Sequence, residues 1–324
     1  AVSISGTSIG LSLETVIRTL RALALDRAAA VRKQVVSSAS KLHKIFYKTH
    51  GPQLLVLLLR GMADISNEIQ LYSYELLSSL EKGTTPETGR VGPILPYPFE
   101  EAKISYVVTE KVTKSLDEIT LIVGKELEIW NKEANLRGLS ILYGAVLAAG
   151  CAFLTCVTNL AVTLSKKLKD DDTDVRTVAC KICSFIGQIL DTASSLALIK
   201  LLPIYRDSNE INSITSGQAS TKSNGETVCH PIIRTDILFF IATCLNNISV
   251  TVAPEITPAI LLVFARKEYV ESCNDDIYAS ILVILESLFL QPKNIYLSSK
   301  MEFYALRILL QIEGSSTSKT IQMK

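Results

Sequence analysis

Residues 170–189, with the sequence DDDTDVRTVACKICSFIGQI, contain the features that decide the fold. An acidic turn is followed by Val175 and Arg176, and apolar residues then recur at helical spacing. This apolar stripe comprises Val175, Ala179, Ile182, Ile186 and Ile189. Apolar residues three or four positions apart lie on one face of an α-helix. The stretch therefore predicts an amphipathic helix that begins directly after an acidic turn.

Similar helix starts recur along the chain. Each begins with a β-branched or leucine residue, usually followed by arginine, and the six starts are Val31, Ile69, Leu136, Val175, Ile233 and Ile277. Several neighbouring starts are about 40 residues apart, a period typical of repeats that contain two helices. The sequence therefore predicts an array of helix pairs.

A second regularity accompanies these starts. An aspartate or asparagine stands six positions before the Arg or Gln of the helix, in the pairs Asp26 and Arg32, Asp64 and Gln70, Asn131 and Arg137, and Asp170 and Arg176. We expect the first residue to cap the following helix, and the arginine to reach the aspartate of a neighbouring repeat. Stacked repeats would then form a ladder of ion pairs. This Asp/Asn…Val-Arg pattern resembles the HEAT repeat family, although Val228 and Ser272 replace the aspartate in the fifth and sixth repeats.

The resemblance implies an all-α protein, a right-handed α-solenoid of about six HEAT/armadillo-like helix pairs. We expect one array over residues 1–324, with repeats at about 7–49, 51–82, 99–150, 151–191, 195–247 and 254–290 and a partial repeat at 297–312. The first helices of the pairs are expected at Leu11–Leu25, Gln53–Met62, Glu101–Leu116, Ala152–Leu168, Leu196–Tyr205 and Ile256–Ala265. Insertions rich in Pro and Gly at 83–98, and in Ser, Thr and Asn at 207–230, interrupt the array, and residues 314–324 form a tail.

The uncharged segment Leu139–Leu164 is long enough to cross a membrane. Gly150 lies near its middle, Asn159 and several Ser and Thr lower its hydrophobicity, and aromatic residues do not flank both ends. We therefore expect two buried helices joined at Gly150 and no membrane span. An integral membrane protein is the alternative.

The composition narrows the class of partner. The chain has 33 basic and 32 acidic residues, so it lacks the strong positive charge of proteins that bind nucleic acid or anionic membranes by bulk electrostatics. Apolar residues make up 48% of the chain, which excludes global disorder. Seven cysteines form no even disulfide framework, so we expect a reducing, cytoplasmic location.

Catalytic and metal-binding patterns are weak in this sequence. Cys180 and Cys183 have the spacing of half a zinc site, but they stand within a helical stripe and no second pair follows at zinc-finger spacing. We expect these two thiols, and those of Cys151 and Cys156, to be buried apolar groups. The sequence contains no G-x-S-x-G, H-E-x-x-H or G-x-G-x-x-G motif. We therefore expect no enzyme, cofactor or metal.

The irregular features of the sequence suggest a more specific family within the HEAT-repeat proteins. The segment Leu95-Pro96-Tyr97-Pro98-Phe99 is followed by a helix, by Trp130 seven residues before Arg137, and then by the acidic turn at 170–174. This order resembles the middle of the HEAT-repeat factors for cytoplasmic preassembly of axonemal dynein, over about Val31–Leu201. The resemblance implies a non-enzymatic cytoplasmic scaffold with dynein chains and chaperones as partners, and it transfers no binding residue. Other HEAT adaptors, such as nuclear-transport receptors or phosphatase scaffolds, remain alternatives.

In a solenoid, the second helices of the pairs line a concave surface that binds proteins. The polar positions expected on that surface are Lys33, Lys41, Tyr74, Lys181 and Gln188. These residues are the sequence-based candidates for contact with a protein partner.

Overall fold

A computed structural model describes residues 6–80, 95–100, 106–201, 235–248, 253–264, 279–285 and 308. These residues are all-α and include no strand, as the sequence predicts. The chain divides into two compact units, one of residues 1–156 and 170–185 and one of residues 157–169 and 186–324. The expected loop at 207–230, the tail at 314–324, most of the 83–98 insertion and nearly all of the partial repeat lie outside the described residues.

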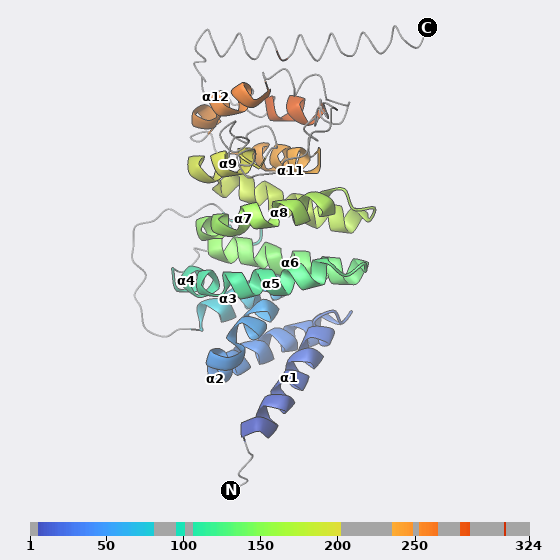
Figure 1. Cartoon of the computed structure of the whole chain (residues 1–324). Helices are drawn as coiled ribbons and strands as arrows, with labels where there is room; N and C mark the ends of the chain where they lie inside the picture. The colour runs from blue at the N-terminus through green and yellow to red at the C-terminus, as the bar shows by residue number, and fades with distance from the viewer. Residues whose placement is uncertain are drawn as a thin grey trace, which may run out of the picture. The chain divides into compact units, whose positions relative to one another are not determined.

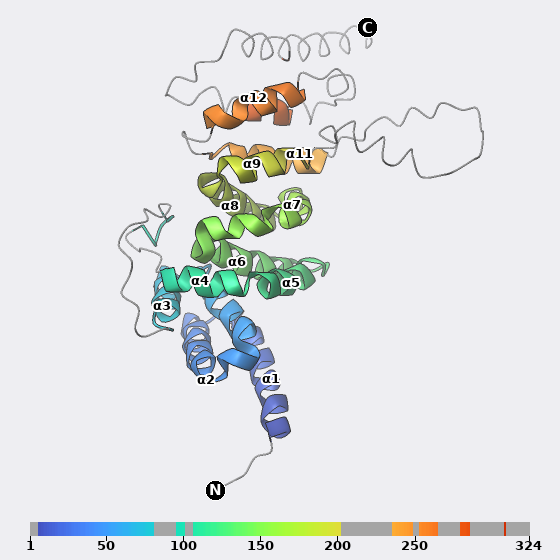
Figure 2. The same ribbon diagram turned by 60° about the vertical axis from the view of Figure 1, so that its left-hand side comes forward.

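The first unit is built around the second helix. Its elements are α1 (Gly6–Leu23), α2 (Ala29–Gly61), α3 (Asn67–Ser78), α4 (Tyr106–Lys114), α5 (Leu116–Leu127), α6 (Lys132–Ala149), the 3-10 turn η1 (Gly150–Phe153) and most of α8 (Thr173–Ile189). Helix α2 packs against α1, α3 and α6. Helices α5 and α6 lie side by side as a hairpin (Figures 1 and 2).

Helix α2 joins two segments that the sequence analysis assigned to different repeats. The backbone leaves helical geometry at Phe46 and at His50, just before Pro52. Proline lacks the backbone N–H and disfavours helical geometry in the preceding residues, so a kink is expected at this point. The second segment is almost fully buried from Leu54 to Leu59. The element α2 therefore consists of two helices that meet at a kink near residue 50, where the sequence analysis placed a boundary.

The third repeat differs from the prediction. Instead of one helix at Glu101–Leu116, the described residues show α4 followed by α5, with a break at Ser115 (φ −107°, ψ 4°). Helix α5 has its own buried stripe, Leu116, Ile119, Val123 and Leu127. Helix α5 packs against α6, so the described part of residues 99–150, where one helix pair was expected, contains α4, α5 and α6.

The apolar stretch considered as a membrane span is broken at Gly150, as predicted. Helix α6 ends at Ala149, Gly150 has a φ of +52°, and α7 (Leu154–Leu168) begins after η1. A positive φ is readily adopted only by glycine, which explains the residue at this break. Residues 132–168 are the one described segment long and apolar enough to cross a membrane, and 72% of their most apolar window is buried. A core helix of a soluble protein has the same properties, so this segment is weak evidence for a membrane span.

Two glycines allow close helix packing in the first unit. A Cβ atom at Gly144 of α6 would overlap the carbonyl group of Leu59 in α2. A Cβ at Gly61, the last residue of α2, would overlap the Ser73 side chain of α3. The central helix therefore approaches α6 and α3 at positions where only glycine fits without rearrangement.

The second unit contains the rest of the described helices. These are α7 from residue 157, the end of α8 from residue 186, α9 (Thr192–Ile199), α11 (Thr235–Leu245), α12 (Ala253–Phe264) and the helical residues 279–285. Helix α9 packs against α12 and is capped by Asp191, whose carboxylate accepts a 2.7 Å hydrogen bond from the Ser194 N–H. A Cβ at Gly187 of α8 would overlap the carbonyl group of Cys244 in α11.

Candidate functional site

Three aspartates fix the turns before α2, α3 and α8 in the same way. Asp26 Oδ1 accepts from the Ala28 N–H at 2.8 Å, Asp64 Oδ1 from Ser66 at 2.9 Å, and Asp170 Oδ1 from Asp172 at 3.1 Å. Each donor is the residue directly before the first helical residue. The aspartates therefore bind the N-cap residue, whereas the prediction placed them in direct contact with the helix. In α8, Asp172 makes the capping bonds, to the Asp174 and Val175 N–H groups.

The side chain six residues later closes each of these turns. Arg32 Nη1 donates to the Asp26 carbonyl at 2.8 Å, and Arg176 Nη1 donates to the Asp170 carbonyl at 2.6 Å. The Gln70 amide donates to the Asp64 carbonyl in the same manner. The spacing of six therefore has a local cause, because a long side chain in the first helical turn folds back onto the preceding loop.

Asn131 does not belong to this register. It is itself the N-cap of α6, and its side chain accepts from the Glu133 N–H at 2.8 Å. Arg137 consequently lies two positions further into its helix than Arg32 and Arg176 do in theirs. It binds Glu126 of α5, with Nε at 3.1 Å and Nη2 at 2.9 Å from the same carboxylate oxygen. The spacing in the sequence matched that of the other turns, but the structural position is different.

The predicted ladder between neighbouring turns forms at one of its expected positions. Arg32 Nε and Nη2 donate to the two Asp64 oxygens at 2.7 and 2.9 Å, and both side chains are less than a tenth exposed. The hydrogen bond to Asp64 raises the pKa of Arg32 despite the opposing effect of burial. Arg137 and Arg176 do not continue the ladder as expected, since Arg137 binds Glu126 and Arg176 donates to groups of its own turn.

Lysines provide contacts that the sequence analysis missed. Lys132, at the start of α6, lies 2.7 Å from Asp172 and 2.6 Å from Asp174 at the start of α8. Lys33 lies 2.6 Å from Glu68, at the start of α3. The carboxylates raise the pKa of both lysines. The sequence could have indicated these contacts, because a lysine lies beside one turn and acidic residues lie at a later turn.

Large apolar side chains are exposed at two of these turns. Ile65 is 90% exposed in the turn between α2 and α3, and Trp130 is fully exposed in the turn between α5 and α6. Ile129, beside Trp130, is 49% exposed. We call Ile129 and Trp130 the turn surface. The position of Trp130 in the sequence marks a family resemblance but does not reveal that its side chain is exposed.

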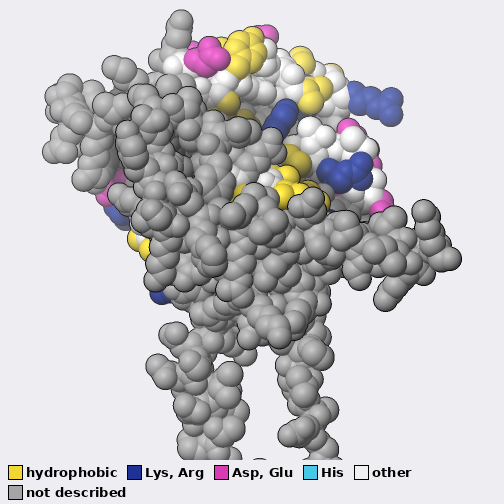
Figure 3. All heavy atoms as spheres, turned by 90° about the horizontal axis from the view of Figure 1, so that it is seen from above, with side chains coloured by type: hydrophobic (Ala, Val, Ile, Leu, Met, Phe, Trp, Pro, Cys, Tyr) yellow, Lys and Arg dark blue, Asp and Glu magenta, His cyan; other side chains and the backbone are white. Residues whose placement is uncertain are grey.

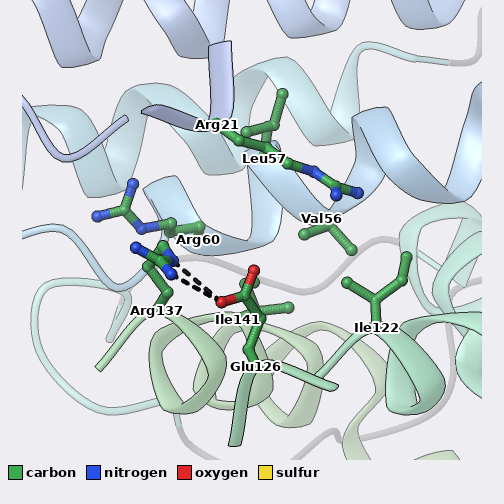
Figure 4. Close-up of a pocket in the computed structure, with 8 residues that line it drawn as sticks. All are labelled: Arg21, Val56, Leu57, Arg60, Ile122, Glu126, Arg137 and Ile141. Carbon is green, nitrogen blue, oxygen red and sulfur yellow. Dashed lines mark hydrogen bonds and ion pairs between the residues drawn. The ribbon is translucent and has the colours of Figure 1, made fainter. Parts of the chain in front are cut away.

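A cleft opens close to these turns, and we call it the arginine cleft. Its volume is about 20 Å³, and it is lined by residues of α1, α2, α5 and α6, namely Arg21, Val56, Leu57, Arg60, Ile122, Glu126, Arg137 and Ile141. Figure 4 shows Arg60 beside the Arg137–Glu126 pair, with Arg21 extending toward Val56 and Ile122. Three arginines and one carboxylate therefore line this cleft, and Arg137 is the arginine that binds the carboxylate. Of these residues, only Arg137 was a candidate from the sequence.

The five predicted contact residues have different environments. Lys41, Lys181 and Gln188 are exposed. Lys33 is held by Glu68 and lies 5.1 Å from the Tyr72 ring centre, and the Tyr74 ring packs 5.9 Å from Phe99. Gln188 belongs to the second unit and the other four to the first. On the face shown in Figure 3, basic, acidic and apolar side chains of the described residues are interspersed.

The described residues contain no group of three or more His, Cys, Asp or Glu side chains that could hold a metal ion. Cys156 and Cys183 are buried, as expected, but Cys151 and Cys180 are exposed. The expectation for these two thiols was wrong because Cys180 lies beside the buried stripe of α8, and Cys151 lies in the short turn η1.

Comparisons with known proteins give little guidance. No family model matches the chain. No curated protein matches it either. A crystal structure of an engineered protein is similar over 84% of this chain and 96% of its own, with 13% identity and a TM-score of 0.29. A similarity at this level carries no argument about fold or function.

Proposed function

We propose that this chain is a non-enzymatic scaffold that binds other proteins, built as a right-handed α-solenoid of about six HEAT/armadillo-like helix pairs. Three turns with the same aspartate hydrogen bond support a repeating unit. The break at Gly150 and the paired helices α5 and α6 are compatible with such an array. In repeat proteins of this kind, the turns and inner helices form extended binding surfaces.

The observation that carries the proposal is the complete exposure of Trp130. Tryptophan is enriched among the residues that dominate protein interfaces, and an exposed apolar cluster on a soluble protein marks an interaction site. Ile129 adjoins it, and the Asn131 cap and the Lys132 ion pairs hold the turn in place. A rigid turn loses little conformational entropy when a partner binds.

The dynein-preassembly resemblance suggests which proteins bind. Its aromatic markers Tyr97 and Trp130 are both exposed, at 68% and 103%. Asn67 of α3 donates to the Tyr97 hydroxyl at 2.9 Å, and Leu95 and Phe99 on either side of the Pro-Tyr-Pro segment are buried. The segment is thus anchored on the first unit with Tyr97 facing solvent. We propose that the chain acts in the cytoplasm, where it binds dynein chains and chaperones.

Removal of the protein from a ciliated cell tests this function. We expect loss of outer and inner dynein arms, while other axonemal parts remain. Re-expression of the wild-type chain or of Leu121→Ala restores the arms, and re-expression of Trp130→Ala does not. Leu121 is a matched control because it is an apolar residue of α5 that is 61% exposed and lies outside the turn.

Normal arms in cells without the protein would contradict the dynein assignment. Capture of a nuclear-transport GTPase or of a phosphatase catalytic subunit through Trp130 would assign the scaffold to one of the alternative adaptor classes. Equal rescue by Trp130→Ala and Leu121→Ala would show that the turn surface is not used.

A further inference from the structure

The turn surface is bordered by carboxylates that have no cation of their own. Glu128 and Glu133 stand on either side of Trp130 in the chain, and all of residues 128–133 are exposed. Neither glutamate forms an ion pair with another described residue. A partner that approaches this turn therefore meets an exposed indole ring between two uncompensated negative charges.

The turn before α8 adds negative charge to the same region. Lys132 lies 2.7 Å from Asp172 and 2.6 Å from Asp174, so this lysine joins the two turns. Its single positive charge is shared between two carboxylates, and the Asp174 side chain remains 68% exposed. The ion pairs thus hold the turns together without making the region neutral.

The local charge differs from that of the whole chain. Residues 125–137 and 170–176 together contain seven acidic and four basic side chains, a net charge of −3, whereas the whole chain carries +1. The next cation along the chain, Lys169, does not offset this charge, because it extends toward Phe239, with 5.8 Å between its Nζ and the ring centre. The turn surface therefore lies in a negative patch on a nearly neutral protein.

The exposed side chains define what such a patch binds. Trp130 is 103% exposed, so both faces of its ring are open to a ligand. The face of an indole ring is electron-rich and attracts lysine and arginine side chains, arginine most often. Ile129, 49% exposed, offers an apolar contact beside the ring. A segment with a cationic residue next to an apolar one therefore matches the ring, the isoleucine and the carboxylates together.

We propose that the turn surface binds a basic segment of a partner protein, in which an arginine lies over the Trp130 ring and a neighbouring apolar side chain contacts Ile129. This inference deepens the proposed scaffold function and rests on it. Glu128 and Glu133 attract the other cations of the segment. The same carboxylates repel acidic segments, so charge decides which segments bind.

A peptide titration of the full chain tests the proposal. Trp130 is the single tryptophan of the chain, so tryptophan fluorescence reports on this site alone. The probe is acetyl-Leu-Arg-Leu-Arg-amide, and two matched peptides carry Gln or Glu in place of Arg. We expect the arginine peptide to change the emission saturably and to bind more weakly as salt is added. The glutamine peptide should bind at least about fivefold more weakly, and the glutamate peptide should cause no change.

Variants separate the roles of the carboxylates and of the ring. Glu128→Gln/Glu133→Gln should weaken binding of the arginine peptide at least about fivefold. Asp117→Asn/Glu118→Gln is the matched control, because it removes the same charge from the exposed first turn of α5. That turn lies about 15 Å of helix away, beyond the screening length of physiological salt, so binding should change less than about twofold. Trp130→Leu keeps an apolar side chain without the aromatic face and should weaken binding in calorimetry.

Several outcomes overturn the proposal. These are equal binding, or no binding, of the arginine and glutamine peptides, preference for the glutamate peptide, and undiminished binding in Glu128→Gln/Glu133→Gln. An emission change with protein concentration alone would place a second copy of the chain on the turn surface instead of a basic partner. The rescue experiment separates this inference from the proposed function: full rescue by Glu128→Gln/Glu133→Gln beside failure of Trp130→Ala would retain the scaffold and reject its basic partner.

Discussion

The buried pair Arg32–Asp64 gives the sharpest test of the turn architecture. Replacement of Arg32 by Met removes two hydrogen bonds to Asp64 and two to the carbonyls of Asp26 and Arg27. It leaves the Asp64 carboxylate, 9% exposed, without its cation. Breaking a buried pair in this way costs about 3–5 kcal/mol. We expect the free energy of unfolding to fall by that amount.

Arg176→Met is the matched control. Arg176 has the same position in its turn and donates to the same two carbonyl positions, but its remaining bond is to the Thr173 hydroxyl. Its side chain is also more exposed than that of Arg32. Loss of these partly exposed bonds should cost about 1 kcal/mol. The two variants should therefore differ by roughly 2–4 kcal/mol.

Urea denaturation followed by circular dichroism measures the difference, with the m-value as a check that the same surface unfolds in each variant. The double variant Arg32→Met/Asp64→Asn replaces the unpaired Asp64 carboxylate with a neutral amide. The amide oxygen can still accept a hydrogen bond from the Ser66 N–H. The double variant should recover more than half of the loss. Equal destabilisation by Arg32→Met and Arg176→Met, or no recovery in the double variant, would refute the reasoning.

Other predictions follow from single residues. Gly144→Ala should lower the free energy of unfolding by at least about 3 kcal/mol, because its Cβ would overlap the Leu59 carbonyl. Gly124→Ala has open space around its Cβ and should stabilise α5 by up to about 1 kcal/mol in the same urea assay. Burial lowers the pKa of His43 to about 4, so the unfolded chain binds more protons between pH 4 and about 6.5. The free energy of unfolding should therefore fall by about 3 kcal/mol as the pH drops through this range. In thermal melts, His43→Leu should not show this pH-dependent loss. Trp130→Ala should change the free energy of unfolding by less than about 0.5 kcal/mol, because the side chain makes no buried contact; a larger loss would mean that this residue supports the fold.

The helical class of the chain and several of its helix starts were predictable from local patterns. The stripe of α8 is buried at all five positions, since apolar spacing alone assigns a helix face. The spacing of six between Asp and Arg or Gln coincides with three turns, because both partners lie within one loop and one helical turn. The same spacing misplaced Asn131, since a shift of two residues in the cap leaves the sequence spacing unchanged.

The division of α4 from α5 was not predictable in the same way. The apolar residues on both sides of Ser115 fit a single helical period, and the break becomes visible only in the backbone angles. The candidate sites could not be predicted from the sequence either. Exposure of Trp130 and convergence of Arg21, Arg60 and Arg137 depend on which helices meet, and these residues lie far apart in the sequence.

The sequence by itself determined that this chain is helical, that turns precede α2, α3 and α8, and that Gly150 breaks its most apolar stretch, because these properties depend on contacts within a few residues. Tertiary structure decided which ion pairs form, which aromatic side chains face solvent and which arginines converge in one cleft. Those outcomes depend on the approach of α2 to α3, α5 and α6, where Gly61 and Gly144 allow helices to come close, and no local spacing encodes that distance.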